Sequence, residues 1–167
     1  MDFKHDILPL KNIIFRTALR IVLNREEAED IVQDTLLKLW ERRGDLEKVE
    51  NLEAFALTMA RNLAIDRKEK KDNQHVSLEE EKHDRPDDGH GTERELTQRE
   101  TQGFVADIIH ALPEKQRTIL QLRDIEGKTY KEIANVLSIS ESDVKVTLFR
   151  ARNEMKERIL QKKSLFL

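Results

Sequence analysis

Two helix-start signals that flank one short turn constrain the fold more than any other feature of this sequence. Thr129 with Glu132 forms a capping box before an apolar-periodic segment, and Ser140 with Asp143 forms another before the last segment. Only three residues, beginning with Ser138, separate the two predicted helices, which makes a helix-turn-helix. Many such turns have glycine at the first position, and Ser138 there costs about 1 kcal/mol if its φ is positive.

The rest of the chain also predicts helix. Among 167 residues there are only 5 Gly and 3 Pro, whereas good helix formers are plentiful. Asn24 is the expected N-cap of the second helix, and Gly44 its expected end. Pro113 is expected at the first position of a later helix. The remaining helices predicted from apolar periodicity are Ile7–Leu23, a helix that Asn51 or Leu52 opens, Phe104–Leu112, Glu114–Ile125 and Tyr130–Leu137.

Charge and composition divide the chain into three parts. Residues 72–100 carry 4 basic against 10 acidic residues, with few apolar residues and no clear period. We therefore expect an all-α protein with two small helical domains, 1–71 and 99–167, joined by a flexible acidic linker at 72–98. With no cysteine, no apolar run long enough to span a bilayer and no signal sequence, we expect a cytoplasmic protein.

The predicted helix beginning at Arg25 has two organised faces. Its apolar residues Ala28, Ile31, Val32, Leu36, Leu39 and Trp40 form one buried stripe. A second face also repeats at three- and four-residue spacing and consists of Asp30, Gln33, Asp34, Leu37 and Glu41. A solvated face needs no such order, so this surface is a candidate for binding another protein.

The last helix has its own outward face, opposite the packing stripe that includes Val144, Leu148 and Ala151. Phe149 is a large aromatic residue on that face, and thymine methyl groups or sugar edges would suit it. Lys145 and Arg150 can contact guanine edges or phosphates. Further outward residues are Ser142, Val146 and Asn153, and the expected phosphate-positioning charges are Arg117, Arg123, Lys128, Lys131 and Arg152.

Four motifs together resemble the sigma-70-type sigma factors of RNA polymerase, in their small extracytoplasmic-function group. REEAEDIVQDTLLKLW is similar to region 2.2 of that family, and MARNLAIDR to the junction of regions 2.3 and 2.4. LPEKQRTILQLRDIEGKTYKEIANVLSIS and VKVTLFRAR resemble region 4. The motifs occur in family order and cover most of the chain outside the linker.

The resemblance implies a role for each surface. The region 2.2 helix would dock on a coiled coil of the polymerase's largest subunit through Asp30, Gln33, Asp34, Leu37, Trp40 and Glu41. Residues of the basic segment that follows would contact the melting −10 element, namely Arg61, Asn62, Arg67, Lys68 and Lys71. The −35 element would be read by Arg123, Lys128, Tyr130, Lys131, Ser142, Lys145, Val146, Phe149 and Arg150. The flap of the polymerase and an anti-sigma factor, commonly membrane-tethered, are further implied partners.

Some of these residues have a structural alternative. Trp40 lies between the two faces of its helix and is equally explained as a core residue. Arg61 and Asp66 could hold the first domain's helices together instead of contacting DNA. Val146-Thr147 stands where many family members have Ser-Arg, so the promoter sequence cannot be transferred from them. The acidic linker has two alternative roles, either as a mimic of nucleic acid in the RNA exit path of the polymerase or as a simple spacer.

Two other classes of protein share some of these features. A stand-alone regulator that binds operator DNA would have the same helix-turn-helix, but it needs neither the acidic face nor the basic segment 59–71. A carboxylate-bridged metal enzyme would need two E-x-x-H motifs on facing helices, and only Glu80–His83 has that spacing. We therefore expect no catalysis, no metal and no cofactor. The promoter, the inducing signal and the regulon are not encoded in any recognisable motif.

Overall fold

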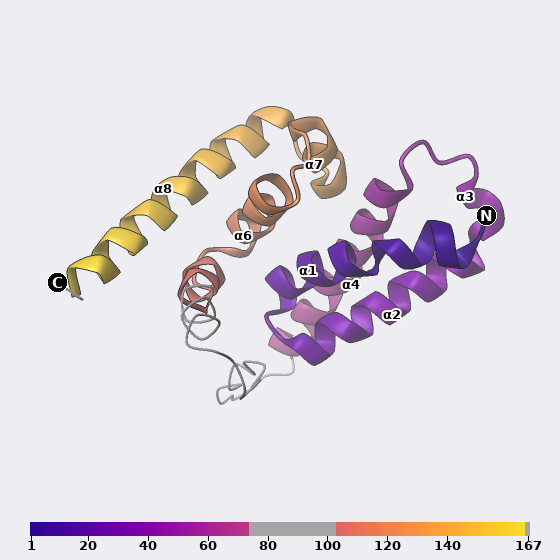
Figure 1. The fold of residues 1–167 in the computed structure, drawn as a ribbon, viewed down its shortest axis with the longest axis horizontal. Coiled ribbons are helices and arrows are strands. Elements are labelled where there is room, and N and C mark those ends of the chain that lie inside the picture. The colour runs from indigo at the N-terminus through magenta and orange to yellow at the C-terminus, as the bar shows by residue number, and fades with distance from the viewer. Residues whose placement is uncertain (74–102, 166–167) are drawn as a thin grey trace, which may run out of the picture.

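The computed structural model describes residues 1–73 and 103–165, and within these ranges every regular element is helical (Figure 1). This confirms the all-α prediction. The expected linker lies outside the described residues, except for Asp72 and Asn73, which end a helix. No described helix is long and apolar enough to cross a membrane.

The N-terminal half is a bundle of three long helices. After a π-helical turn, η1 (Phe3–Ile7), and a 3-10 turn, η2 (Leu8–Leu10), come α1 (Lys11–Val22) and α2 (Arg25–Glu41). The short α3 (Arg43–Leu46) precedes the longest helix of this half, α4 (Leu52–Asn73). α1 packs against both α2 and α4, and α2 also packs against α4.

The caps explain where α2 begins, but not where it ends. The Glu27 backbone N–H donates to Asn24 Oδ1 at 2.9 Å, which confirms the predicted N-cap. The prediction that Gly44 ends this helix was wrong, because α2 stops at Glu41 and Gly44 lies inside α3. Gly44 has no positive φ, so it is not used as a left-handed cap.

Small residues let α4 approach its neighbours. The buried residues of α4 are Ala56, Leu57, Ala60 and Ala64, whereas the larger residues Phe55, Met59, Leu63 and Ile65 are only partly buried. Alanine removes side-chain bulk between helices, so the backbones of α1 and α4 come close together. The alanine face of α4 thus forms part of the bundle core with Ile14, Ala18, Ile21, Ile31 and Leu39.

The C-terminal half contains the predicted helix-turn-helix. A helix at residues 103–110 is followed by α6 (Glu114–Leu120), a π-helical turn η3 (Gln121–Ile125), α7 (Tyr130–Leu137) and α8 (Glu141–Leu165). Both N-caps are confirmed, since Thr129 Oγ1 accepts from Glu132 N–H at 3.1 Å and Ser140 Oγ accepts from Asp143 N–H at 3.0 Å. Ser138 has φ 56°, as expected of the first turn residue.

Two local details of this half concern the backbone of a proline and of a glycine. Pro113 is the N-cap of α6 and not its first helical residue, because its ψ of 148° is extended. Gly127 closes η3 with φ 72°, a left-handed conformation that glycine adopts without steric cost.

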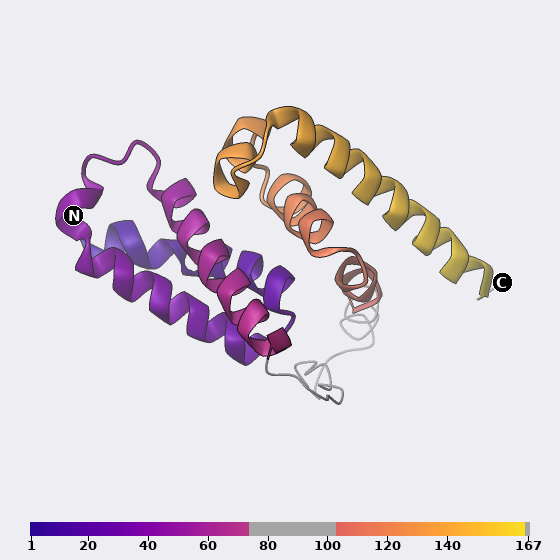
Figure 2. The ribbon, with the colours of Figure 1, turned by 180° about the vertical axis from the view of Figure 1, so that it is seen from behind.

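The two halves pack against each other (Figures 1 and 2). α6 lies against α1, and α7 lies against α4, while α8 packs on α6 and α7 and runs away from the bundle to the C-terminus. Ile13 of α1 and Leu57 of α4 belong to the same buried cluster as Leu122, Ile133 and Leu148. The described residues therefore form one continuous assembly with a shared apolar contact between its halves.

Candidate polymerase and DNA interfaces

The second face of α2 is exposed along its whole length. Asp30, Gln33, Asp34 and Glu41 are all exposed, and Leu37 is 57% exposed at the centre. This confirms the predicted geometry of the face. Leu37 places an exposed apolar side chain near the carboxylates of Asp34 and Glu41 on this helix surface, so the face remains a candidate for binding another protein.

The buried side of α2 is formed by Ala28, Ile31, Thr35 and Leu39. Thr35 was not among the predicted stripe residues because its hydroxyl makes it polar, although it follows Ile31 by four residues. Spacing alone, taken without residue type, would have placed it in the stripe.

Trp40 is only partly buried, so it belongs to both faces of α2. Its ring meets Phe3 edge-to-face with centroids 5.6 Å apart, and the guanidinium of Arg43 lies 4.1 Å from its centroid. These contacts fix the ring from two sides. Trp40 is therefore a packing residue that still borders the acidic face.

The basic end of α4 lies beside the acidic face of α2. Arg67 donates to Asp30 Oδ2 and to Asp34 Oδ2, both at 3.4 Å, and Lys71 Nζ is 3.5 Å from Glu27. All of these side chains are at least a quarter exposed, so each pair is worth only about 0.2–1 kcal/mol. Such weak pairs can exchange with a charged partner at little cost.

The other candidates on α4 differ in accessibility. Asn62 is exposed, and Lys68 is partly exposed. Arg61 is partly buried, and its Nε is buried without a hydrogen-bond partner. Asp66 is exposed, which argues against a buried ion pair with Arg61. The unsatisfied Nε leaves Arg61 with an unmet donor that faces inward.

The outward face of α8 is as predicted. Ser142, Lys145 and Arg150 are exposed, Val146 is 47% exposed and Phe149 is 67% exposed. The opposite side buries Val144, Thr147, Leu148 and Ala151. A large aromatic ring on a helix surface exposes apolar area to water, which is unfavourable unless a partner covers it. This face is therefore the strongest candidate for base contact.

A cationic cluster stands at the start of α7, next to that face. The guanidinium of Arg123 lies 4.7 Å from the ring centroid of Tyr130, and Lys145 Nζ lies 5.6 Å from the same centroid. Arg123 also donates to the Lys128 carbonyl at 2.8 Å. Lys131 is exposed close by in sequence. The ring thus gathers two positive charges at the edge of the helix-turn-helix, where a phosphate group would be attracted.

Three of the expected phosphate-positioning charges are engaged within the protein. Arg117 is only 6% exposed, and it donates to the carbonyls of Arg20 and Leu112, each at 2.6 Å. Burial lowers its pKa from the usual value. The expectation that Arg117 faces phosphate was therefore wrong. Lys128 pairs with Glu53, and Arg152 with Asp124.

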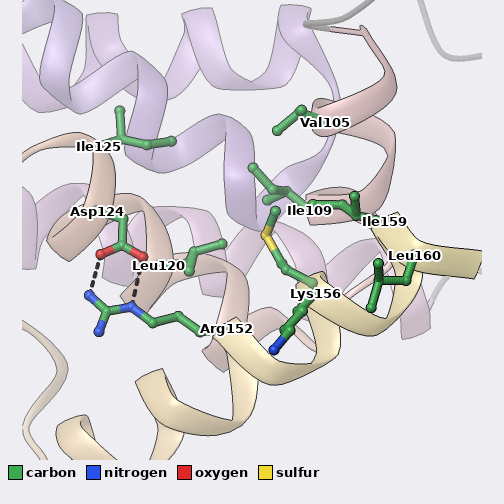
Figure 3. A pocket seen from close by; sticks show the side chains of 10 residues that line it. Val105, Ile109, Leu120, Asp124, Ile125, Arg152, Lys156, Ile159 and Leu160 are labelled. Carbon is green, nitrogen blue, oxygen red and sulfur yellow. Dashed lines mark hydrogen bonds and ion pairs between the residues drawn. The ribbon is translucent and has the colours of Figure 1, made fainter. Parts of the chain in front are cut away.

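An apolar groove of about 440 Å³ lies between the helix at 103–110, the α6–η3 segment and α8 (Figure 3). Val105, Ile109, Leu120, Ile159 and Leu160 line it. The ion pair between Arg152 Nη2 and Asp124 Oδ1 lies at its edge, so the Arg152 guanidinium is already paired within the protein.

Comparisons with known proteins identify both halves. Residues 7–74 match the family described as Sigma-70 region 2, and residues 105–155 match Sigma-70, region 4. The RNA polymerase sigma-H factor of Pseudomonas aeruginosa is 29% identical over 160 residues, which are 91% of this chain and 79% of that protein. The ECF RNA polymerase sigma-E factor of Haemophilus influenzae is 28% identical over 145 residues, 82% of this chain and 77% of that protein.

The fold agrees with these matches. The chain superimposes on the sigma factor RpoE, crystallised with the anti-sigma factor NepR from Bartonella quintana, with a TM-score of 0.70 and 23% identity. The match covers 93% of this chain and 95% of that one.

This chain belongs to the sigma-70 family of RNA polymerase sigma factors, since region 2 and region 4 both match in the family's order. More particularly, it is a sigma factor of the extracytoplasmic-function (ECF) group, which binds core RNA polymerase and directs promoter-specific transcription initiation. Sigma factors are initiation factors and not enzymes. The region 2 match leaves no place for the alternative of a stand-alone operator-binding regulator.

Proposed function

We propose that the exposed face of α2 is the surface that docks on the coiled coil of the polymerase's largest subunit. The observation that carries this proposal is Leu37, 57% exposed and flanked by the carboxylates of Asp30, Asp34 and Glu41. A basic helix can place an apolar contact on Leu37 while its Lys and Arg side chains pair with the rim. Gln33 adds an uncharged hydrogen-bonding group.

Docking of this kind would also prepare α4 for DNA. Arg67 pairs with Asp30 and Asp34 in the free chain, and cations of the polymerase compete for these carboxylates. Arg67 then turns to the backbone of the melted −10 strand, together with Lys68, Lys71, Asn62 and Arg61. The weak geometry of the two 3.4 Å contacts supports this exchange.

The outward face of α8 reads the −35 duplex in the major groove. Phe149 and Val146 supply apolar contact, Lys145 and Arg150 supply charge, and Ser142 supplies a hydroxyl. Arg123, Tyr130 and Lys131 position the phosphate backbone beside them, and Lys128 joins them when it leaves its ion pair with Glu53. The two domains, 1–71 and 99–167, make weak contacts separately, and these become strong together on one polymerase because each raises the effective concentration of the other.

Charge reversal tests the docking surface. Replacing both Asp30 and Asp34 by Lys should weaken the binding of core polymerase in a pull-down at low salt, while circular dichroism shows unchanged helix. Glu47→Lys with Glu50→Lys is the matched control, because both residues are exposed and lie outside α2. Undiminished capture of polymerase by the Asp30 and Asp34 variant would remove the docking proposal.

The remaining roles follow from the family. The protein acts in the cytoplasm, where polymerase meets the chromosome, and carries out no chemistry of its own. The flap of the polymerase is a second contact, on the region 4 half. An anti-sigma factor that masks these surfaces is the expected regulator, since two structural relatives, including one titled CnrH in complex with the cytosolic domain of CnrY, are bound by such proteins. Transcription reconstituted with core polymerase and a genomic DNA library would identify the promoter.

A further inference from the structure

The indole of Trp40 is held at the end of α2 by two side chains from outside that helix. Phe3 of η1 meets the ring edge-to-face, with centroids 5.6 Å apart and ring planes at 84°. Arg43 of α3 places its guanidinium 4.1 Å from the ring centroid. η1 and α3 both pack against α2, and the N-terminus lies beside α3 in both views of the fold (Figures 1 and 2). The ring is therefore fixed by segments that precede and follow the helix that carries it.

Arg43 holds the backbone of Trp40 as well as its ring. The Nη1 of Arg43 donates to the Trp40 carbonyl at 2.8 Å. This carbonyl is one of the last four of α2, which lack the usual backbone donor four residues further on. A cation at this end of a helix also interacts favourably with the negative end of the helix dipole. One guanidinium thus binds the side chain and the main chain of Trp40 together, which leaves the indole little freedom to rotate.

Phe3 is itself held in place by the turn that contains it. Ile7, the last residue of η1, is fully buried in the core of the N-terminal half. Asp2 caps the start of η1, because its Oδ1 accepts from the Lys4 backbone N–H at 3.1 Å. The cap at one end and the buried Ile7 at the other fix the path of η1. The contact between Phe3 and Trp40 therefore belongs to a folded segment.

Trp40 lies at the end of the exposed face of α2. Leu37, the exposed apolar residue of that face, precedes it by three residues, and the exposed Glu41 follows it directly. Residues three apart on a helix are neighbours on its surface, so the part of the indole that stays in solvent lies beside Leu37. Trp40 is only partly buried, so this part is accessible to a partner. The two side chains together form an apolar strip that runs along α2 toward α3.

A ring that is already fixed in the free protein favours binding. Aromatic side chains are frequent anchors of protein interfaces, but a side chain that moves freely must be immobilised when the partner binds. That immobilisation lowers the affinity by about 2- to 12-fold for one side chain with several rotamers. Because Phe3 and Arg43 restrict the Trp40 ring beforehand, the free protein already carries this cost.

We propose that Phe3 and Arg43 are positioning residues for polymerase binding, which hold Trp40 as a second apolar anchor beside Leu37. The inference rests on the proposed docking of this face on the largest subunit of the polymerase. The occupant of the anchor is an apolar side chain of the partner helix, adjacent to the Lys and Arg side chains that pair with the carboxylates of α2. Phe3 and Arg43 act through the orientation of the indole and need no contact with polymerase.

The fluorescence of Trp40 tests whether the ring is held, because it is the single tryptophan of the chain. In the free protein, Phe3→Leu and Arg43→Ala should each increase the quenching of Trp40 by acrylamide and accelerate its depolarisation. Arg43→Lys keeps a cation for the ring and should restore most of the wild-type signal. Unchanged quenching and depolarisation in both variants would show that these side chains do not hold the ring.

The affinity for core polymerase tests whether holding the ring matters for binding. It is measured by the anisotropy of a dye on Lys163→Cys, in the last turn of α8. Phe3→Leu and Arg43→Ala should each raise the dissociation constant by about 2- to 12-fold. Arg42→Ala is the matched control, since it removes the same charge from the neighbouring exposed arginine and leaves both ring contacts in place. An equal loss for Arg42→Ala would assign the effect to charge and not to the ring.

A double-mutant cycle separates positioning from damage to the fold. In a Trp40→Leu background, Arg43→Ala should no longer change the affinity, because no ring remains to be positioned. The proposal is overturned if Arg43→Ala has its full effect in that background, or if a variant with a freed ring binds polymerase as wild type does.

Failure of the docking proposal gives a different result. A chain with both Asp30 and Asp34 replaced by Lys would then bind polymerase undiminished, and the anchor beside Leu37 would have no partner to receive. The fluorescence of the free chain would in that case show only whether Phe3 and Arg43 hold the ring, and their role in polymerase binding would be refuted together with the docking surface.

Discussion

The substitution Leu37→Ala is the most direct test of how this protein binds polymerase. Replacing it by Ala removes most of the apolar surface at the centre of the α2 face and leaves every carboxylate in place. Full burial of a leucine side chain is worth about 1.5–3 kcal/mol. Leu37 is 57% exposed, so docking can gain only the exposed share, about 0.9–1.7 kcal/mol.

That free energy corresponds to a rise of roughly 3- to 15-fold in the dissociation constant for core polymerase, because Ala retains one carbon of the contact. The free energy of unfolding should change by less than about 0.5 kcal/mol, since the side chain is mostly in water already. Fluorescence anisotropy of a chain labelled at Lys163→Cys, titrated with core polymerase, measures the first quantity. Urea denaturation measures the second.

Leu8 provides the control for Leu37. It is an exposed leucine of the same half, 37% exposed, and lies outside the acidic face. Leu8→Ala should bind polymerase as wild type does. Equal affinities for Leu37→Ala and wild type, or equal losses for the Leu37 and Leu8 variants, would show that the α2 face is not the contact or that the apolar centre contributes nothing to it.

Three further predictions concern promoter reading, the turn and pH. Arg150→Ala should reduce transcription from cognate promoters without changing core binding, and wild-type output would show that Arg150 is not a reader. Ser138→Gly should stabilise the fold by about 1 kcal/mol in urea denaturation because φ is 56°, whereas Ser142→Gly, within α8, should destabilise it by about 0.5 kcal/mol. Burial raises the pKa of Glu126, but hydrogen bonds from Arg16 and Gln121 and the charge of Arg20 outweigh it, so its pKa lies below the usual 4.5 and its contribution to the stability of the fold is lost as pH falls below that value. Urea denaturation at a series of pH values should show the free energy of unfolding falling in acid, with a smaller pH-dependent change in Glu126→Gln.

The sequence determined the helices and the direction in which each face points. Asn24, Thr129 and Ser140 mark helix starts by hydrogen bonds to residues three positions away, and such local bonds are encoded locally. The exposed faces of α2 and α8 follow from the helical period alone. The DNA and polymerase roles of these faces came from the motifs, and the residue assignments stay predictions.

Only the tertiary structure decided what each side chain meets. Arg117 looked like a surface cation, but it is buried because its bonding partner is Arg20, 97 positions away in the sequence. Arg16 and Glu126, 110 positions apart, gave no pattern that links them. Local spacing specifies a residue's place on its own helix, whereas a contact between helices depends on how two separate surfaces fit. The packing of the two halves of this sigma factor is a property of that fit.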